Sequence, residues 1–269
     1  RSLRVSTEDR LWRTSPSPLR TEDRAFVDFR NTALYAPVPY LPHAIVIAAA
    51  RRMGCPPLIL FYLARCAGLA AALVLSYLAI RITPIGKRTL LLLALTPMAL
   101  RQMSLVTVDT VTNSASFLLL ALCLRLGRAP EASPGGPGAL ALASLGVSLS
   151  KIAYAPLSLL TLLPRVGHEG SRRPRGMVAL AGIGLAVLGI GLWLWLVRDL
   201  YAAQRIAPDA DPGRQLALIA ANPVWYVGVL LSDLGRNGPT YLWHALGYAG
   251  AGWPALAWPH LAVLIVVAL

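Results

Sequence analysis

Long runs of apolar residues constrain this chain more than any other feature. The clearest are residues Pro57–Ile80 and Gly176–Val197. A run of about 18 or more such residues predicts a helix that crosses a bilayer, because in lipid every backbone N–H and C=O must be bonded within the segment. Charged residues make up 14% of the chain, whereas soluble domains usually carry about 25%. The sequence therefore predicts an all-α, polytopic integral membrane protein with about seven helices or half-helices.

Three further stretches are expected to be helical. Residues Thr89–Met103 and Asp109–Leu126 are predicted as shorter membrane spans, the first with Pro97 near its outer end. Residues His43–Met53 are predicted as a helix that is too short to cross.

The chain divides into four expected segments. Residues 1–34 are polar and of mixed charge, and we expect an extracytoplasmic loop. Residues 35–197 form the transmembrane helical core, residues 198–255 an extracytoplasmic segment rich in aromatic residues, and residues 256–269 the start of a further membrane helix. Because the chain begins without Met and its last apolar run is shorter than a span, we expect a fragment that lacks at least one helix at each end.

Lys151 stands in the middle of an otherwise apolar stretch, Gly138–Pro164. A charge at the centre of a bilayer costs from about 2.5 to more than 10 kcal/mol, so this lysine needs a partner, water or a ligand. The stretch is either one helix of about 40 Å with Lys151 central, or two short helices that meet at Lys151. The choice decides on which side of the membrane everything downstream lies.

The distribution of basic residues favours two short helices. Only that arrangement puts the densest basic loop, which holds Arg165 and Arg175, on the same side as the other basic loops listed below, and basic loops are usually cytoplasmic. The opposite side also holds Arg51, Arg52 and the arginines before Asn31, but long loops of mixed charge follow this rule poorly. Residues Gly170–Arg175 are then cytoplasmic and residues Asp209–Asn222 are outside. We expect Tyr40, Asp109 and Lys151 to share one cavity on the outer side, since these polar groups are costly to leave in lipid. The basic residues concerned are Arg81, Lys87, Arg88, Arg125, Arg128, Arg165, Arg172, Arg173 and Arg175.

The net charge of +13 points to a membrane partner. The arginines flank apolar runs, so anionic lipid headgroups are the expected counterions. No zinc-finger or helix-turn-helix spacing is present, and we expect no nucleic-acid partner. Cys55, Cys66 and Cys123 have no metal-binding spacing and are interpreted as small packing residues.

Several motifs together resemble a known family. The runs YAPVPYLPHAIVIAAARRMGCPPLILFYLAR, VTVDTVTNSASFLLLAL and LSKIAYAPL occur in this order, followed by DPGRQLALIAANPVWYVGVLL and GYAGAGWP. They resemble a bacterial family of multipass membrane proteins of unknown function that is related to GT-C glycosyltransferases. The resemblance covers residues Asn31–Pro254. It implies a GT-C-like helical bundle with broken or re-entrant helices in the bacterial plasma membrane.

The resemblance also implies a reaction. GT-C enzymes transfer a sugar from a polyprenyl-phosphate carrier to an acceptor on the outer face, and a carboxylate in the first outer loop acts as base or as metal ligand. A divalent metal is thus compatible with the resemblance, but the sequence predicts no particular cofactor. The family's acidic pair follows a first helix, which we expect to precede Arg1, so the catalytic acid is expected upstream of Arg1. Glu22, Asp23 and Asp28 are weak candidates for the general base. The alternative is that all three belong to a solvated loop.

Two residues near the expected helix break are candidate substrate-binding residues. Lys151 matches the lysine of the family's Ser-Lys turn, and a lysine there is suited to a lipid-linked phosphate. The alternative is a lysine that snorkels to the interface. Asp109 follows Val106-Thr107-Val108 and begins a helix, and the alternative is an N-cap.

Four more residues complete the candidate binding set. Arg65 matches the family's Leu-Ala-Arg position and is expected to clamp a phosphate or a carboxylate, unless it forms a structural ion pair. Tyr35, Tyr40 and His43 flank the proline motif that the resemblance places near the substrate cleft. The alternative for these three is a re-entrant loop anchored by aromatic residues at the interface.

Other functions remain open from the sequence. A transporter or flippase of lipid-linked saccharides would also use cations and broken helices near the membrane midplane, and a non-catalytic membrane scaffold is a third reading. The late aromatic residues are interpreted as an interface belt rather than a sugar-stacking surface. They are Trp225, Tyr226, Tyr241, Trp243, Tyr248 and Trp253.

Overall fold

The computed structural model describes residues 32, 34–128, 136–162, 173–203 and 211–246. Every regular element in these ranges is a helix, and the described residues include no strand. The expected all-α membrane-type fold is thus confirmed. The elements up to residue 128 are η2 (Val38–Tyr40), α2 (Leu41–Arg52), α3 (Pro57–Ile82), α4 (Lys87–Ala94), α5 (Pro97–Met103) and α6 (Asp109–Arg128). The later ones are α7 (Gly136–Ser150), η4 (Ile152–Leu162), α8 (Arg173–Leu196), α9 (Arg198–Ala203), α10 (Pro212–Ala221) and α11 (Pro223–Leu246).

Among the described residues, two helices, α3 and α6, are long and apolar enough to cross a membrane. A third candidate is the pair formed by α10 and α11, which is bent by 101°. Shorter apolar helices are α7, η4 and the described part of α8. Helices α7 and η4 pack beside α6, and α8 packs against α7 and η4.

Small residues bring α3 close to its neighbours. Ala64, Gly68, Ala72 and Ser76 recur at every fourth position and are all buried. Small side chains on one helix face let backbones approach closely, which is how helices associate in lipid. Ser76 Oγ donates a hydrogen bond to Ser114 Oγ of α6 at 3.0 Å. Ser76 lies at the α3–α6 contact, the most extensive between helices in the described part, whereas Gly68 faces His43 of α2.

The chain reverses at Lys151, as expected. Helix α7 ends at Ser150, and η4, a 3-10 helix that contains Pro156, follows Lys151. Leu157 and Leu160 of η4 pack against a core that includes residues of α6 and α7. That core is Leu119, Leu122, Cys123, Leu140 and Val147. The two-short-helix prediction for Gly138–Pro164 is confirmed, and a single long helix is excluded.

The single span expected over Thr89–Met103 is wrong. The structure has two short helices there, α4 and α5, which are separated at Leu95 and Thr96. Pro97 stands at the first position of α5, where its fixed φ suits a helix start. The Thr96 side chain accepts a hydrogen bond from Ala99 N at 3.4 Å and caps this second helix. Pro97 therefore starts a helix rather than interrupting one.

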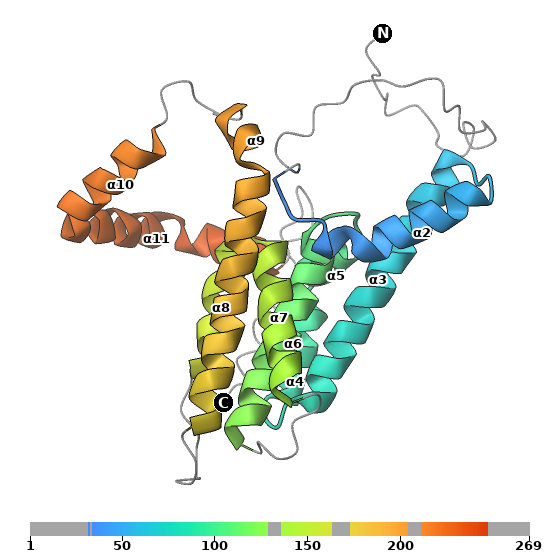
Figure 1. Ribbon diagram of the computed structural model, residues 1–269, viewed down its shortest axis with the longest axis horizontal. Helices are drawn as coiled ribbons and strands as arrows, with labels where there is room; N and C mark the ends of the chain where they lie inside the picture. Colours follow the sequence, from blue (N-terminus) through green and yellow to red (C-terminus); the bar gives the residue numbers. More distant parts are fainter. Residues whose placement is uncertain (1–31, 33, 129–135, 163–172, 204–210, 247–269) are drawn as a thin grey trace.

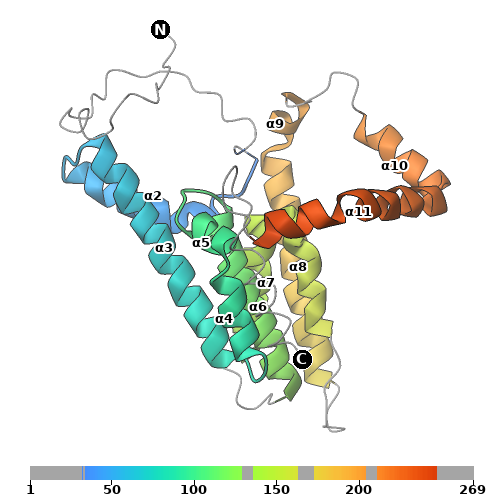
Figure 2. The same cartoon turned by 180° about the vertical axis from the view of Figure 1, so that it is seen from behind.

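Helix ends gather at two opposite ends of the bundle (Figures 1 and 2). At one end, here called the Lys151 end, α3 and α6 begin and α5, α7 and α8 finish. At the other, α3 and α6 finish and α4, α7 and α8 begin. Arg81, Lys87, Arg125 and Arg128 belong to helix ends at this second end, here called the basic end. The Lys151 end and the basic end are thus separated along the bundle, and Arg101, in the last turn of α5, lies at the Lys151 end.

The segment after residue 197 is helical where it is described. Helix α11 lies across the end of the bundle rather than along it (Figure 1). Its residues are almost all exposed. The expected segment boundaries at 34, 197 and 255 remain predictions, since residues 1–31 and 247–269 lie outside the described part of the chain.

Candidate functional site

An ion pair joins α6 to the chain reversal at the Lys151 end. Lys151 Nζ donates a hydrogen bond to Asp109 Oδ1 at 2.6 Å. The two side chains keep 25% and 24% of their surface exposed. Asp109 is the first residue of α6, and Lys151 lies between α7 and η4. Two of the residues predicted to bind substrate are therefore in direct contact, and Lys151 has the partner that its position requires.

A second pair of side chains lies beside the first. Tyr154 OH donates to Asn113 Oδ1 at 3.4 Å, and Asn113 Nδ2 donates to Gln102 Oε1 at 2.6 Å. Asn113 follows Asp109 by four residues, one turn of an α-helix. Tyr154 follows Lys151 by three, one turn of a 3-10 helix. The two spacings match, so α6 and η4 are joined by two parallel contacts.

A cavity of about 270 Å³ adjoins Lys151. Tyr35 and Trp193 supply its aromatic lining. Trp193 Nε1 donates to the carbonyl of Leu34 at 2.7 Å, which ties the end of α8 to the segment that precedes η2. The remaining lining residues are Leu34, Ala36, Leu149, Ser150, Ile152 and Ala153. The cavity thus combines one cation with two aromatic side chains.

Two titratable groups at this end have shifted pKa values. Burial raises the pKa of Tyr40, and the nearby Tyr35 and Asp109 raise it further. Lys151 and a hydrogen bond with the backbone of Val108 lower this pKa, but by less, so the net shift is upward. Burial alone lowers the pKa of Lys151, but the hydrogen bond and the charge of Asp109 outweigh it, so the net pKa is raised. Tyr40 is therefore close to the ion pair electrostatically, although neither Tyr40 nor Asp109 lines the cavity.

His43 packs between α2 and α3. Its Nδ1 donates to the carbonyl of Ala64 at 2.8 Å, and its side chain is almost fully buried. A Cβ added at Gly68 would lie 2.0 Å from His43 Cε1. Its Nε2 is buried and has no hydrogen-bond partner among the described residues. The ring contacts that of Tyr40, with 6.5 Å between centroids, but does not line the Lys151 cavity.

Arg65 binds a carbonyl rather than a carboxylate. Its Nε donates to the carbonyl of Ser104 at 2.6 Å. Its guanidinium carbon lies 5.6 Å from the Phe61 ring centroid and 5.9 Å from that of Tyr62. Arg65 therefore connects α3 to the loop that leads into Asp109, outside the cavity.

The described residues do not fit a divalent metal site. Divalent cations such as Mg²⁺ and Ca²⁺ need several oxygen ligands, and Asp109 Oδ1 is already bonded to Lys151. No group of three or more His, Cys, Asp or Glu side chains suited to a metal occurs in the part of the chain that the structure describes. Glu22, Asp23 and Asp28 lie outside that part.

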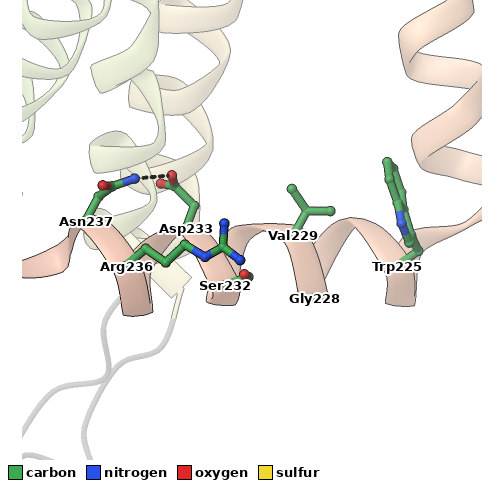
Figure 3. A pocket seen from close by; sticks show the side chains of 7 residues that line it. All are labelled: Trp225, Gly228, Val229, Ser232, Asp233, Arg236 and Asn237. Carbon is green, nitrogen blue, oxygen red and sulfur yellow. Dashed lines mark hydrogen bonds between the residues drawn. The ribbon is translucent and has the colours of Figure 1, made fainter.

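A second, larger hollow follows one face of α11 (Figure 3). Its volume is about 490 Å³, and all its described lining residues belong to this one helix. Asp233 accepts hydrogen bonds from Asn237 at 2.8 Å and from Tyr241 at 2.6 Å, so its carboxylate is satisfied within the helix. Trp225 at one end of this face is 64% exposed. A single exposed helix does not enclose a ligand, and we place the candidate site at Lys151 instead.

Four side chains of the site were not among the residues predicted from the sequence. They are Gln102, Asn113, Tyr154 and Trp193. Asn113 and Tyr154 could have been predicted from the sequence, because each lies one helical turn from a predicted site residue. No sequence pattern identifies Gln102 and Trp193 as site residues, since their roles depend on how α5 and α8 pack.

The comparisons agree with a membrane protein. A family model described as "Predicted membrane protein (DUF2142)" matches residues 4–269, nearly the whole chain. No curated protein and no solved structure matches the chain. The chain therefore belongs to DUF2142, a family of predicted membrane proteins.

Proposed function

We propose that the chain is an outer-face, glycosyltransferase-like protein of the bacterial plasma membrane that takes its sugar from a polyprenyl-phosphate carrier. The observation that supports this most is the Lys151–Asp109 pair beside the cavity with Tyr35 and Trp193. A cation, a carboxylate and two aromatic rings together suit a sugar linked to a phosphate.

In this proposal Lys151 contacts the carrier phosphate. A lysine ammonium has three N–H donors, and one of them is engaged by Asp109. The other two are available to phosphate oxygens, and a quarter of the side chain is exposed. Asp109 holds the ammonium in place, so little side-chain freedom is lost when the phosphate binds.

The size of the cavity suits a headgroup. Its volume of about 270 Å³ lies just below the roughly 300–1,000 Å³ typical of small-molecule sites. That space suits a single sugar and its phosphate, with the sugar against the rings of Tyr35 and Trp193. The prenyl chain would then lie outside the cavity, against the apolar helix surfaces.

The reaction is a transfer from phosphate to a hydroxyl group. The acceptor oxygen forms a bond to the anomeric carbon while the bond from that carbon to the phosphate oxygen breaks, and polyprenyl phosphate leaves. The hydroxyl proton passes to a carboxylate. Asp109 is bonded to Lys151 and does not line the cavity, so we expect this carboxylate outside the described residues, where Glu22, Asp23 and Asp28 are candidates.

One observation favours a transporter or flippase as the second candidate. The break between α7 and η4 places a charged residue between two short apolar helices. Helices of this broken kind hold the substrate sites of many transporters.

A transfer assay with the full-length protein in proteoliposomes separates the two candidates. We expect wild-type protein to convert a polyprenyl-phosphate-linked sugar and an acceptor into product and free polyprenyl phosphate. Asp109→Asn, which removes the partner that positions Lys151, should slow this transfer, while Asp233→Asn, which removes an exposed carboxylate of α11, should not. Movement of the labelled carrier between leaflets without transfer would favour the flippase, and neither transfer nor movement would contradict both functions.

A further inference from the structure

Arg65 carries a positive charge within a candidate membrane span, and no described carboxylate neutralises it. The ion pairs among the described residues join Lys151 to Asp109 and Arg198 to Asp199. The hydrogen-bond acceptor of Arg65 is the uncharged carbonyl of Ser104. A charge in such a helix normally pairs with an opposite charge or a backbone carbonyl, or reaches water. Arg65 has the carbonyl but no described carboxylate, so its positive charge is left for an anion to balance.

The depth of Arg65 in the helix suits a lipid headgroup. Helix α3 has 26 residues, which is about 39 Å of helix against a hydrocarbon core of about 30 Å. Arg65 follows Pro57 by about 12 Å. If the excess length is shared between the two ends, Arg65 starts about 7–8 Å inside the hydrocarbon boundary. An arginine side chain can span such a distance and place its guanidinium at the headgroups.

The local geometry leaves the guanidinium ready for a phosphate. Arginine has five N–H donors in a planar fork, and Nε is the one bonded to Ser104. Those on the terminal nitrogens have no hydrogen-bond partner among the described residues. Phe61 and Tyr62 flank the guanidinium and are themselves 47% and 50% exposed. The donors left on a fork that is held on one side match the paired oxygens of a phosphate.

From this geometry we infer that Arg65 binds the phosphate of a membrane lipid at the outer surface of α3, with Phe61 and Tyr62 beside the headgroup. The inference does not depend on the proposed sugar transfer. Arg65 also differs from Lys151, because Lys151 has a carboxylate partner, Asp109, and Arg65 has none among the described residues. The phosphate can belong to a bulk anionic phospholipid or to a polyprenyl carrier, and the two share the chemistry that Arg65 recognises.

Lipid titrations of the purified full-length protein test the inference. Phosphatidylglycerol and polyprenyl monophosphate are titrated separately against wild type and Arg65→Gln. We expect Arg65→Gln to weaken binding of at least one lipid by about ten-fold or more. Loss for phosphatidylglycerol alone identifies a phospholipid site, and loss for polyprenyl monophosphate identifies the carrier as a ligand of the same group.

Arg198→Gln is the matched control. Arg198 also lies over an aromatic ring, with its guanidinium carbon 5.4 Å from the Trp195 centroid, but it has a carboxylate partner, Asp199 at 3.7 Å. Its replacement should change affinity by less than about two-fold, as is usual for exposed pairs. Equal effects of Arg65→Gln and Arg198→Gln would overturn the inference.

Arg65→Lys distinguishes charge from folding. This variant loses the bond from Nε to Ser104, as Arg65→Gln does, but keeps the positive charge. We expect its lipid affinity to lie between those of wild type and Arg65→Gln. Its melting temperature should be no higher than that of Arg65→Gln. If Arg65→Lys binds as weakly as Arg65→Gln, the role of Arg65 is structural and the lipid site is wrong.

Discussion

Lys151 shows how one residue can be tolerated where its side chain alone would be costly. The sequence indicated that this lysine needs a partner, water or a ligand, and the structure supplies Asp109 at 2.6 Å together with partial exposure to a cavity. A partly buried lysine without a partner would pay the cost of removing its charge from water. The ion pair offsets part of this cost and links two helices that are distant in sequence.

Breaking the pair should destabilise the protein. Lys151→Met leaves Asp109 without its partner, and we expect the free energy of unfolding to fall by about 1.5–3 kcal/mol. Asp109→Asn combined with Lys151→Met should cost less than the sum of the single changes, because no unpaired charge remains. Unfolding of the four proteins in the same detergent measures this coupling, and strictly additive effects would show that the pair contributes nothing.

The pair should be insensitive to pH near neutrality. The pKa of Lys151 is raised above its usual 10.5, so the folded state holds this proton more tightly than the unfolded state. The resulting stabilisation is fully present below the unfolded pKa and is lost only as pH rises through the raised folded value. The difference in melting temperature between wild type and Lys151→Met should be constant between about pH 6 and 9. A difference that falls within this range would mean that Lys151 titrates there.

At the scale of the helices, contact between α2 and α3 depends on a missing side chain. Gly68 leaves the space that His43 fills, since a Cβ there would approach the His43 ring to 2.0 Å. The ring is buried and its Nδ1 is bonded to Ala64 O, so it cannot move aside cheaply.

Gly68→Ala should therefore be destabilising, although alanine favours helices. We expect a loss of about 1–3 kcal/mol from overpacking. Gly184→Ala is the matched control in α8, where an added Cβ meets no atom within 4 Å. It should be neutral or stabilising by up to about 1 kcal/mol. Thermal unfolding compares the two, and an equal response of both variants would refute the close α2–α3 contact.

Sequence patterns predicted some elements and not others for physical reasons. Long apolar runs and the break at Lys151 were predictable, because lipid imposes strict rules on length and charge. The separation of α4 from α5 was not, because a proline near a helix end can either kink a helix or start a new one. The helices after residue 211 were also missed, since mixed polar and aromatic residues give a weak periodic signal.

For the whole molecule, the arrangement of helix ends carries the topology. The helix ends opposite the Lys151 end carry Arg81, Lys87, Arg125 and Arg128, and Figure 2 shows these two ends apart along the bundle. Basic loops are usually cytoplasmic, so we predict that the Lys151 end faces outward. The break at Lys151, which the sequence predicted, determines which helices meet at that end. The contacts within the site did not follow from the sequence, because they depend on packing between α5, α6, η4 and α8.

Cysteine labelling in intact cells tests this orientation. With Cys55, Cys66 and Cys123 replaced by serine, we expect Asp211→Cys to react with a membrane-impermeant thiol reagent. Lys87→Cys, at the basic end, should react only after the cells are opened. The reverse pattern would contradict the proposed topology.

Binding of polyprenyl phosphate by two lysine variants tests the central claim most directly. Lys151 and Lys87 are the two lysines of the chain, and they lie at opposite ends of the bundle. We predict that Lys151→Ala weakens binding to the purified full-length protein by roughly ten- to more than a hundred-fold, while Lys151→Arg keeps part of the affinity and Lys87→Ala keeps all of it. Folding is checked by the melting temperature of each variant. If folded Lys151→Ala binds polyprenyl phosphate as tightly as wild type, Lys151 is not the phosphate contact and the proposed site is wrong.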